Sequence, residues 1–343
     1  MATRQQQGDV ARGSETPERA DTMRAIVQRQ YGAADALHLE RIPRPKPADD
    51  EILVRVRAAS LSRGTWHLMS GKPYVMRLGL GFRGPKTPTA GQDLAGTVVA
   101  TGAAVTGFEV GDDVFGVGSG SFAEYAVARE DKLARKPMNV SFEQAASVPV
   151  SASTALQGLR DVGRVAPGQK VLIIGASGGV GTFAVQLAKA LGASVTGVCS
   201  TSKLELVRSL GADRVIDYTA TDFSAMPDRY DLILDIGGNA TLRRLRRALT
   251  PHGTLVIVGG EDGGDWVGMS RQLRAIGVSP FSRQRLAMFV ATLNTRDLEQ
   301  LTEFIESGAV TPVLDRTFTL EQLPDAMRHL QSGAARGKIA ISI

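Results

Sequence analysis

Residues 171–181 read Val171-Leu172-Ile173-Ile174-Gly175-Ala176-Ser177-Gly178-Gly179-Val180-Gly181. The first four form an apolar run that is typical of a fully buried parallel strand. A helix is predicted to follow, because apolar side chains recur on one stripe. That stripe consists of Val180, Ala184, Leu187, Ala188 and Leu191. A buried strand, a glycine-rich turn and an amphipathic helix in this order predict the start of a βαβ unit.

The turn fits the pattern Ala-x-Gly-x-x-Gly of a dinucleotide-binding loop at Ala176, Gly178 and Gly181. At Gly178 the missing side chain lets the backbone approach a pyrophosphate, and at Gly181 it lets the helix pack closely on the strand. The N–H groups of Gly179 and Val180 then point at phosphate oxygens from the positive end of the helix. The cofactor contacts expected in this loop are Ser177, Gly178, Gly179 and Val180. A plain tight turn is the alternative.

Similar apolar runs recur downstream, and helical patterns separate most of them. The expected strands lie at 171–174, 195–199, 214–217, 232–235 and 255–258, with a sixth at 276–278. Alternating strands and helices predict an α/β fold with a doubly wound parallel sheet, and six strands is the Rossmann count. Before residue 150 the signals are short, β-like and punctuated by Gly and Pro, so we expect an irregular, mostly β domain there.

The composition is that of an ordinary globular protein, with 43% hydrophobic and 22% charged residues among 343. A single cysteine, Cys199, excludes an intramolecular disulfide and a Cys-rich zinc module. The four histidines are widely spaced in the sequence, so little remains from which a zinc site could be built. They are His38, His67, His252 and His329.

The net charge is +5, and 40 basic side chains are diluted among 35 acidic ones. We therefore expect no nucleic-acid partner, and the densest basic run, at 243–247, is interpreted as a solvated helix face, with RNA binding as the alternative. No apolar run approaches the ~18 residues that span a bilayer, so no membrane partner is expected. Residues 1–22 are polar and acidic enough to exclude a secretory signal or a transit peptide. We expect a disordered leader and a cytoplasmic protein.

The residues after the second expected strand bear on which dinucleotide is bound. An NAD site places Asp or Glu there to bind the ribose 2′-hydroxyl. This chain instead reads Cys199-Ser200-Thr201-Ser202-Lys203, with no acid before Glu205. A lysine beside hydroxyl groups suits a 2′-phosphate, which a carboxylate would repel, so we favour NADPH over NADH with Ser200 and Lys203 as contacts. The alternative is a solvated lysine at the start of a helix.

Further motifs extend through the chain. They are Gly91-Gln92-Asp93-Leu94-Ala95-Gly96, Gly111-Asp112-Asp113-Val114-Phe115-Gly116, Phe122-Ala123-Glu124-Tyr125, Ala145-Ala146, Ser153-Thr154-Ala155-Leu156, AVQLAKALGA at 184–193, Gly211-Ala212-Asp213 and Gly337-Lys338. In this order they resemble the zinc-independent medium-chain dehydrogenase/reductases, in their quinone oxidoreductase and enoyl-reductase-like branch. The resemblance covers nearly the whole chain after residue 22.

The resemblance implies a division of the chain. A leader at 1–22 precedes a GroES-like, mostly β catalytic domain at 23–149. A Rossmann dinucleotide-binding domain follows at 150–281, and a C-terminal segment at 282–343 returns to the catalytic domain. The active site then lies in the cleft between the two domains, and a homodimer is expected.

The resemblance also implies a set of cofactor contacts. A lysine and a tyrosine with the spacing of Lys203 and Tyr218 contact the 2′-phosphate in NADPH-using relatives. Thr154 and Lys338 are expected as further contacts, and Gly259 opens a glycine-rich loop at 259–264 near the nicotinamide. Zinc-dependent relatives carry Cys where this chain has Ser62, and His where it has Gln92. We therefore expect no catalytic metal.

A catalytic stretch is implied in the same way. Relatives often read Asn-x-x-Asp-x-Tyr where this chain has Ser62-Arg63-Gly64-Thr65-Trp66-His67. Ser62 retains hydrogen-bonding capacity, and His67 is our candidate donor to a carbonyl or enolate oxygen. Tyr74 is the second candidate donor. The alternative for His67 is a histidine that packs against or caps a helical turn.

These features favour an NADPH-dependent, metal-free reductase of quinones or α,β-unsaturated carbonyl compounds, working by hydride transfer. One alternative is a zinc-free NADP-dependent alcohol or carbonyl dehydrogenase, which would share every cofactor residue. An alternative of another class is a non-catalytic protein that binds NADPH as a sensor, or that binds RNA.

Overall fold

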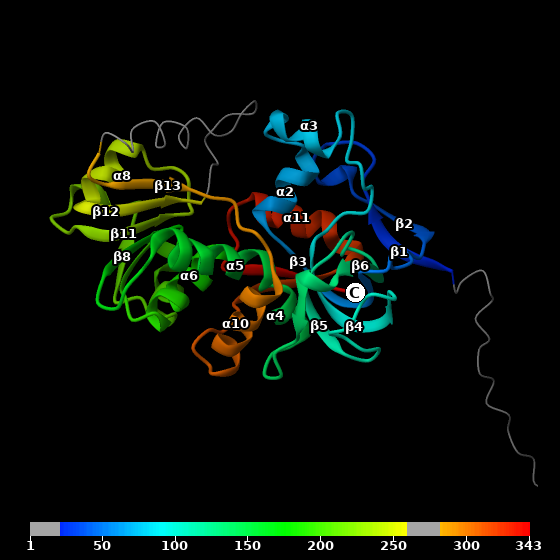
Figure 1. Cartoon of the computed structure of the whole chain (residues 1–343). Coiled ribbons are helices and arrows are strands. Elements are labelled where there is room, and N and C mark those ends of the chain that lie inside the picture. The colour runs from blue at the N-terminus through cyan, green and yellow to red at the C-terminus, as the bar shows by residue number, and fades with distance from the viewer. Residues whose placement is uncertain (1–20, 259–281) are drawn as a thin grey trace, which may run out of the picture.

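The computed structural model describes residues 21–258 and 282–343. Figure 1 shows two bodies side by side, a parallel sheet with its helices on the left and a mainly antiparallel sheet on the right. The last part of the chain, coloured orange to red, passes from the first body to the second. The two bodies are thus joined by segments that are distant in sequence.

The left-hand sheet has six parallel strands in the order β10-β9-β8-β11-β12-β13. Their bounds are β8 Lys170–Ile174, β9 Ser194–Cys199, β10 Arg214–Asp217, β11 Tyr230–Asp235, β12 Leu249–Ile257 and β13 Arg285–Met288. The order reverses between β8 and β11, and such a switch point opens a crevice at the carboxyl ends of the strands. The predicted Rossmann sheet is confirmed.

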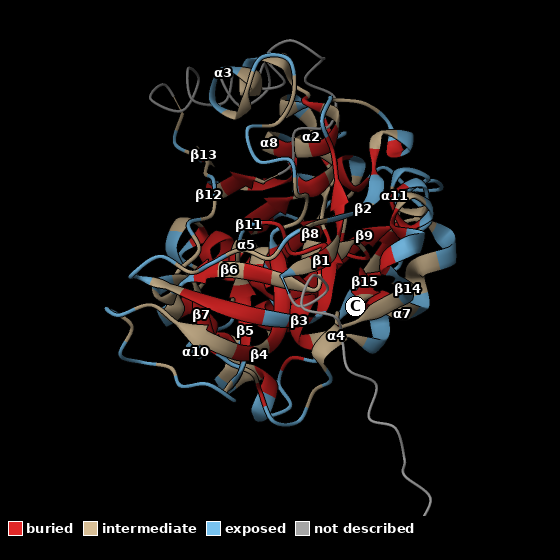
Figure 2. Cartoon of the chain, turned by 90° about the vertical axis from the view of Figure 1, so that its right-hand side faces the viewer, coloured by how far each residue is buried: buried red, intermediate tan, exposed pale blue. Residues whose placement is uncertain are grey.

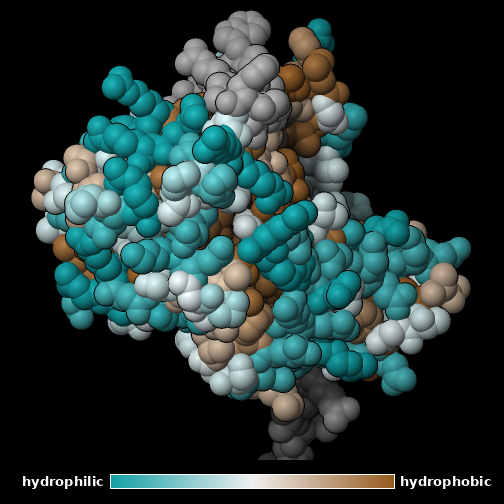
Figure 3. All heavy atoms as spheres, turned by 60° about the vertical axis from the view of Figure 1, so that its left-hand side comes forward, coloured by the Kyte–Doolittle hydropathy of each residue, from teal (hydrophilic) through white to brown (hydrophobic). Residues whose placement is uncertain are grey.

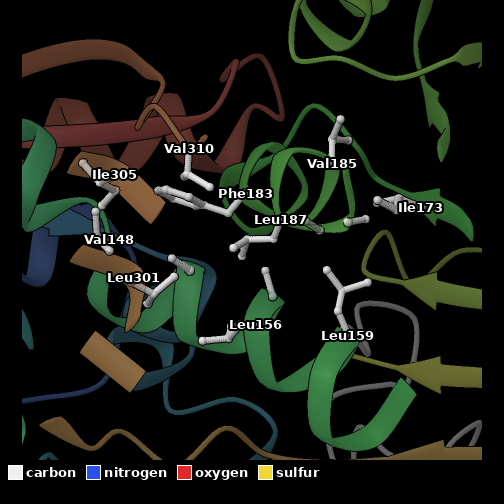
Figure 4. Packing of buried hydrophobic residues seen from close by; sticks show 14 of the residues in the cluster. Val148, Leu156, Leu159, Ile173, Phe183, Val185, Leu187, Leu301, Ile305 and Val310 are labelled. Carbon is white, nitrogen blue, oxygen red and sulfur yellow. The ribbon is translucent and has the colours of Figure 1, made fainter. Parts of the chain in front are cut away.

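Helices cover both faces of this sheet, because successive residues of a strand point to opposite sides. Val171 and Ile173 pack on one face, whereas Leu172 and Ile174 pack on the other. The first face carries α5 Pro149–Gln157, α6 Gly179–Ala190, α7 Leu204–Ser209 and α10 Thr295–Glu306, and the second carries α8 Leu242–Ala248. Figure 4 shows Phe183 and Leu187 of α6 gathered with Leu156 of α5 and Leu301 of α10.

The right-hand sheet runs β14-β15-β3-β4-β5-β7, with β6 also paired to β3. Its strands are β3 Glu51–Leu61, β4 Asp93–Thr101, β5 Asp113–Val117, β6 Tyr125–Arg129, β7 Leu133–Arg135, β14 Leu314–Thr319 and β15 Lys338–Ser342. A two-stranded hairpin and four helices surround this sheet. The hairpin consists of β1 Thr22–Val27 and β2 His38–Pro43, and the helices are α2 Arg63–Ser70, α3 Arg77–Leu80, α4 Phe142–Ala146 and α11 Leu323–Gln331. The final strand β15 pairs antiparallel with β3, so the C-terminus lies inside this domain.

The buried strands of both sheets form the interior of the molecule (Figure 2). Between them, α4 and α5 contribute alanines to the cluster that also covers the parallel sheet. Small side chains there let the two domains approach closely.

Several boundaries differ from the sequence-based prediction. The sixth parallel strand is Arg285–Met288, so the Rossmann domain extends beyond the expected boundary at residue 281. The strand expected at 276–278 and the leader residues 1–20 lie outside the described residues, and β1 begins at Thr22. Helix α5 begins at Pro149, because a proline suits the first helical position, and it continues as a π-helical turn over Gly158–Gly163.

A buried ion pair lies within the antiparallel sheet, where Lys338 begins β15 and Asp93 begins β4, at the edge that faces α5. The Lys338 Nζ lies 3.5 Å from Asp93 Oδ2 and donates to the Leu61 carbonyl oxygen at 2.9 Å. Asp93 in turn accepts from the Ser60 hydroxyl and from the backbone N–H of Val150 at the start of α5. Burial lowers the pKa of Lys338 and raises the pKa of Asp93, because removal from water disfavours the charged form of each.

We predict that Asp93→Asn lowers the free energy of unfolding by about 3–5 kcal/mol, since it leaves a buried ammonium without its counter-charge. The double variant Asp93→Asn/Lys338→Met should recover most of this loss, because no isolated charge remains. Urea unfolding, monitored by circular dichroism, measures the free energy of unfolding of the single and the double variant. The matched control is Asp213→Asn, which breaks the exposed pair with Lys189 and should cost less than about 1 kcal/mol. Equal costs for the two single variants would contradict this account.

Candidate functional site

The glycine loop connects β8 to α6 at the carboxyl edge of the parallel sheet. Gly175 has φ +85°, a left-handed conformation that favours glycine. A Cβ placed on Gly181 would lie 2.1 Å from the Gly175 carbonyl oxygen, so this close approach of helix and strand requires glycine. The expected role of Gly181 in helix packing follows directly from this distance.

The remaining loop residues leave room for a ligand. Gly178 is the N-cap of the 12-residue helix α6, and a Cβ placed on it would meet only the Gly175 oxygen at 3.5 Å. Gly178, Gly179 and Val180 are half-exposed. The first N–H groups of a helix have no acceptor within it, so those of Gly179 and Val180 are available to an anion. The loop therefore fits a phosphate group.

The C-terminal strand borders this loop. The Gly337 N–H donates to the Ser177 carbonyl oxygen at 2.9 Å, and the Lys338 Cδ lies 3.1 Å from a Cβ placed on Gly179. The Lys338 ammonium, however, is committed to Asp93 and Leu61. The structure thus places the expected contact Lys338 beside the loop through its aliphatic stem, while its charge points away from the loop, toward Asp93 and Leu61 of its own sheet.

Lys203 and Tyr218 follow the neighbouring strands β9 and β10, as their spacing in sequence suggests. The Lys203 Nζ donates to the carbonyl oxygens of Gly333 and Ala335 at 2.8 Å each, so one of its three N–H groups remains for a ligand. Partial burial lowers the pKa of Lys203. Tyr218 is 61% exposed, and Ser200 is half-exposed. No hydrogen bond joins the Lys203 and Tyr218 side chains in the described structure.

Two residues near this edge were missed by the sequence analysis. Arg336 follows Ala335, is exposed, and lies close enough to Lys203 to lower the pKa of that lysine. Asp217 lies beside Cys199 in the parallel register, and it accepts from the Thr201 hydroxyl at 2.5 Å and the Thr219 hydroxyl at 2.7 Å. These hydrogen bonds lower the pKa of Asp217. Strand pairing brings Asp217 to the site and the return of the C-terminal segment brings Arg336 there, and local sequence spacing reveals neither.

The candidate catalytic stretch forms helix α2. The Ser62 hydroxyl accepts from the Thr65 N–H at 3.3 Å and completes a capping box, so Ser62 has a structural role as the N-cap. The His67 Nδ1 lies 2.8 Å from the Lys72 carbonyl oxygen. A carbonyl only accepts, so Nδ1 carries the proton and Nε2 can donate to a substrate only when the ring is protonated.

Tyr74 lies in a stack of aromatic and guanidinium groups. The Arg77 guanidinium is 4.6 Å from the centre of the Tyr74 ring and 4.5 Å from that of Tyr31. Its Nε also donates to the Gly71 carbonyl oxygen, which fixes the turn after α2. These contacts give the Tyr74 ring a packing role.

A cavity of about 800 Å³ lies in the catalytic domain and reaches the segment that follows β13. Thr65 and Leu68 of α2 and Gln92 line it, together with residues 291–293. Ser62, His67 and Tyr74 are not among its lining residues. Gln92 of the cavity wall directly precedes Asp93, and Asp93 pairs with Lys338, which borders the glycine loop. The Asp93–Lys338 pair therefore lies between the cavity and the loop.

The donor set near the cleft is poor in metal ligands. Ser62, exposed Gln92 and half-exposed Thr154 offer neutral oxygen and nitrogen atoms, and the Thr154 hydroxyl already donates to the Val150 carbonyl oxygen. Within residues 21–258 and 282–343, no group of three or more His, Cys, Asp or Glu side chains could hold a metal ion. Gly259, which we expect near the nicotinamide, lies outside the described residues.

Comparison with known proteins agrees with this architecture. Residues 48–138 match the family model described as alcohol dehydrogenase GroES-like domain, and residues 210–341 match the one described as zinc-binding dehydrogenase. The chain is 34% identical to a 2-methylene-furan-3-one reductase of Solanum lycopersicum over 93% of its own length and 79% of that protein. It is 35% identical to a chloroplastic NADPH-dependent alkenal/one oxidoreductase of Arabidopsis thaliana, with the same coverage.

A solved structure is similar as well. The quinone oxidoreductase from Coxiella burnetii superposes with a TM-score of 0.83 at 28% identity, covering 94% of this chain and 99% of that one. Identity above 30% to full-length relatives and the matching two-domain fold agree with the motifs quoted from the sequence. The chain therefore belongs to the medium-chain dehydrogenase/reductase superfamily, in the branch of oxidoreductases that contains quinone oxidoreductases and enone reductases.

Proposed function

We propose that this protein is an NADP(H)-dependent, metal-free reductase of quinones or α,β-unsaturated carbonyl compounds. The observation that carries the proposal is the half-exposed glycine loop, which borders the catalytic domain at the side chain of Lys338. Lys338 touches Gly179 with its stem and Leu61 with its ammonium group, and Leu61 directly precedes Ser62. A dinucleotide bound at the loop would thus extend along the boundary between the domains.

The residues present fit NADP(H). The N-terminus of α6 offers N–H groups to the pyrophosphate, and Gly178 leaves space for it. Lys203 and Arg336 supply positive charge at the carboxyl end of β9, where the 2′-phosphate would lie, and Ser200 and Tyr218 supply hydroxyl groups. Asp217 is held by two threonine hydroxyls, which leaves its carboxylate less available to a ribose hydroxyl. Relatives named as NADPH-dependent support this choice.

The cofactor supplies a hydride, and the chain's own residues must position the acceptor and provide a proton or a hydrogen bond. A cavity of about 800 Å³ suits a small organic substrate. Thr65 and Gln92 line it and can donate to a carbonyl oxygen. His67 does not line this cavity; it follows the lining residue Thr65 on α2, and its Nε2, opposite the Nδ1 held by Lys72, is our proposed donor in the protonated state.

The absence of a catalytic metal is proposed from the donor chemistry. Ser62, Gln92 and Thr154 are weak zinc ligands compared with thiolate and imidazole. Negative charge on the substrate would then be stabilised by hydrogen-bond donors alone. The same site would serve a carbonyl or alcohol dehydrogenase, which differs only in the bond that accepts the hydride.

A homodimer and a cytoplasmic location remain predictions. Strand β13 is the last strand of the parallel sheet in the described structure, and an edge strand can pair with a second copy. Light scattering coupled to gel filtration determines the oligomeric state.

The proposal predicts NADPH oxidation with a quinone or an enone as acceptor and little oxidation with an aldehyde. The rate of NADPH oxidation is measured from the absorbance of the reduced nicotinamide, with and without each acceptor. Preference for the aldehyde would favour the carbonyl dehydrogenase. Tight NADPH binding without turnover of any acceptor would favour a sensor.

We expect Lys203→Glu to weaken NADPH binding on the order of 10- to 100-fold and NADH binding far less, because a charge-assisted hydrogen bond to the 2′-phosphate becomes a repulsion. Titration calorimetry with both nucleotides gives the ratio. Lys170→Glu, the same charge reversal at the opposite end of β8, is the control. Equal weakening of both nucleotides would remove Lys203 from 2′-phosphate recognition.

We expect His67→Phe to lower turnover on the order of 100-fold and to leave NADPH affinity unchanged, since a proton donor is lost and the cofactor loop is untouched. His38→Phe, on exposed strand β2, is the matched control. Steady-state kinetics and cofactor titration separate the two effects. Unchanged turnover would assign His67 a purely structural role at the end of α2.

A further inference from the structure

The segment that carries α2 and α3 lacks acidic residues. From residue 52 to residue 92 the sequence contains no Asp or Glu. Its basic residues are Arg55, Arg57, Arg63, Lys72, Arg77, Arg83 and Lys86. The outer part of this segment, residues 74–86, is here called the α3 lobe. It is positively charged by composition, while the chain as a whole is nearly balanced.

The α3 lobe also exposes large apolar side chains. Leu78 and Phe82 are 76% and 78% exposed, and Val75 is 43% exposed. In Figure 3 hydrophobic atoms gather at the top of the molecule, where Figure 1 places α3. The other exposed large apolar side chains of the described structure lie in separate segments. Contiguous apolar exposure of this kind marks a binding surface rather than ordinary surface composition.

Among the described residues, no carboxylate forms an ion pair with a basic side chain of the lobe. Arg77 is held by two tyrosine rings and backbone carbonyl oxygens, and it forms no ion pair with a described residue. Arg83 and Lys86 are exposed and likewise form no ion pair in the described structure. Arg29, whose carbonyl oxygen lies against Gly84, already pairs with Glu40. Glu40 is therefore engaged by a cation outside the lobe.

We propose that the α3 lobe docks this protein on the surface of a membrane that contains anionic lipids. Leu78 and Phe82 would enter the headgroup boundary, and Arg83 and Lys86 would contact lipid phosphates. None of the described helices has the length and apolarity to cross a bilayer, but peripheral docking needs no such helix. This proposal departs from our expectation from the sequence that no membrane partner is bound.

Two other occupants fit the lobe less well. A second copy pairing through the same surface would place like charges opposite each other, because a two-fold interface is formed by the same patch on both subunits. A nucleic acid would attract the cations but would leave Leu78 and Phe82 in water. An anionic bilayer satisfies both features at once.

The lobe is also connected to the cavity. Gly79, Leu80, Pro85 and Lys86, all within the lobe, line part of the cavity wall. Docking would thus bring the cavity against the lipid surface. The docking itself does not depend on the proposed reductase activity and is tested without it.

Vesicle flotation with the full chain tests the proposal. We expect the protein to bind vesicles that contain phosphatidylcholine and phosphatidylserine in a molar ratio of roughly two to one. We expect little binding to vesicles of phosphatidylcholine alone. Leu78→Ser/Phe82→Ser should reduce the partition coefficient about 100-fold, at about ten-fold per apolar side chain removed from the bilayer. Arg83→Glu should reduce it about 25-fold, since each unit of charge near an anionic surface contributes about five-fold.

Matched controls lie outside the lobe. Val110→Ser/Met138→Ser removes two equally exposed apolar side chains, and Arg316→Glu reverses one exposed charge on β14. Both should bind vesicles as the parent chain does, and circular dichroism checks the fold of every variant. The proposal is overturned if no vesicle binds, if neutral vesicles bind equally, or if lobe and control variants behave alike. It is also overturned if Leu78→Ser/Phe82→Ser instead converts a dimer into a monomer, because the surface would then be an interface between copies.

Discussion

The Lys338 side chain is the contact through which the glycine loop meets the antiparallel sheet. Its stem lies against the glycine loop, and its ammonium group is held by Asp93 and the Leu61 carbonyl oxygen of its own sheet. A charge buried this deeply is stable only with its partner in place, so the ion pair fixes the position of Lys338 beside the loop. The start of α2, and with it the catalytic stretch, inherits its position from this contact.

The candidate site lies around this Lys338 contact and has a cofactor part and a substrate part. The glycine loop and the edge formed by Lys203 and Arg336 provide fixed N–H groups and positive charge for a dinucleotide. Gln92 and Thr65 face the cavity, whereas Ser62 and Tyr74 stabilise the turns around it. Hydride chemistry needs little more than this, because the reactive atom belongs to the cofactor and the protein contributes orientation and hydrogen bonds. Side chains at the helix cap thus support the site without facing the substrate.

Some features were readable in the sequence because they are local. The strand, glycine turn and helix of residues 171–190 follow from hydrophobic periodicity, and Gly175 and Gly181 occupy the positions where only glycine fits. The strand Arg285–Met288 was missed because four residues with mixed polarity give almost no periodic signal. Asp217 was missed because only strand pairing brings it beside Cys199, and Arg336 was missed because only the return of the C-terminal segment brings it near Lys203.

By itself, the sequence determined the order of strands and helices, the dinucleotide loop and the scarcity of metal ligands, since each depends on residue type and short-range spacing. The tertiary structure decided which side chains meet. It bonded Lys338 to Asp93 across 245 residues, placed Thr65 rather than Ser62 on the cavity wall, and exposed Leu78 and Phe82 together on the α3 lobe. Such contacts depend on the packing of distant segments, and burial and electrostatic complementarity select them only once the chain is folded.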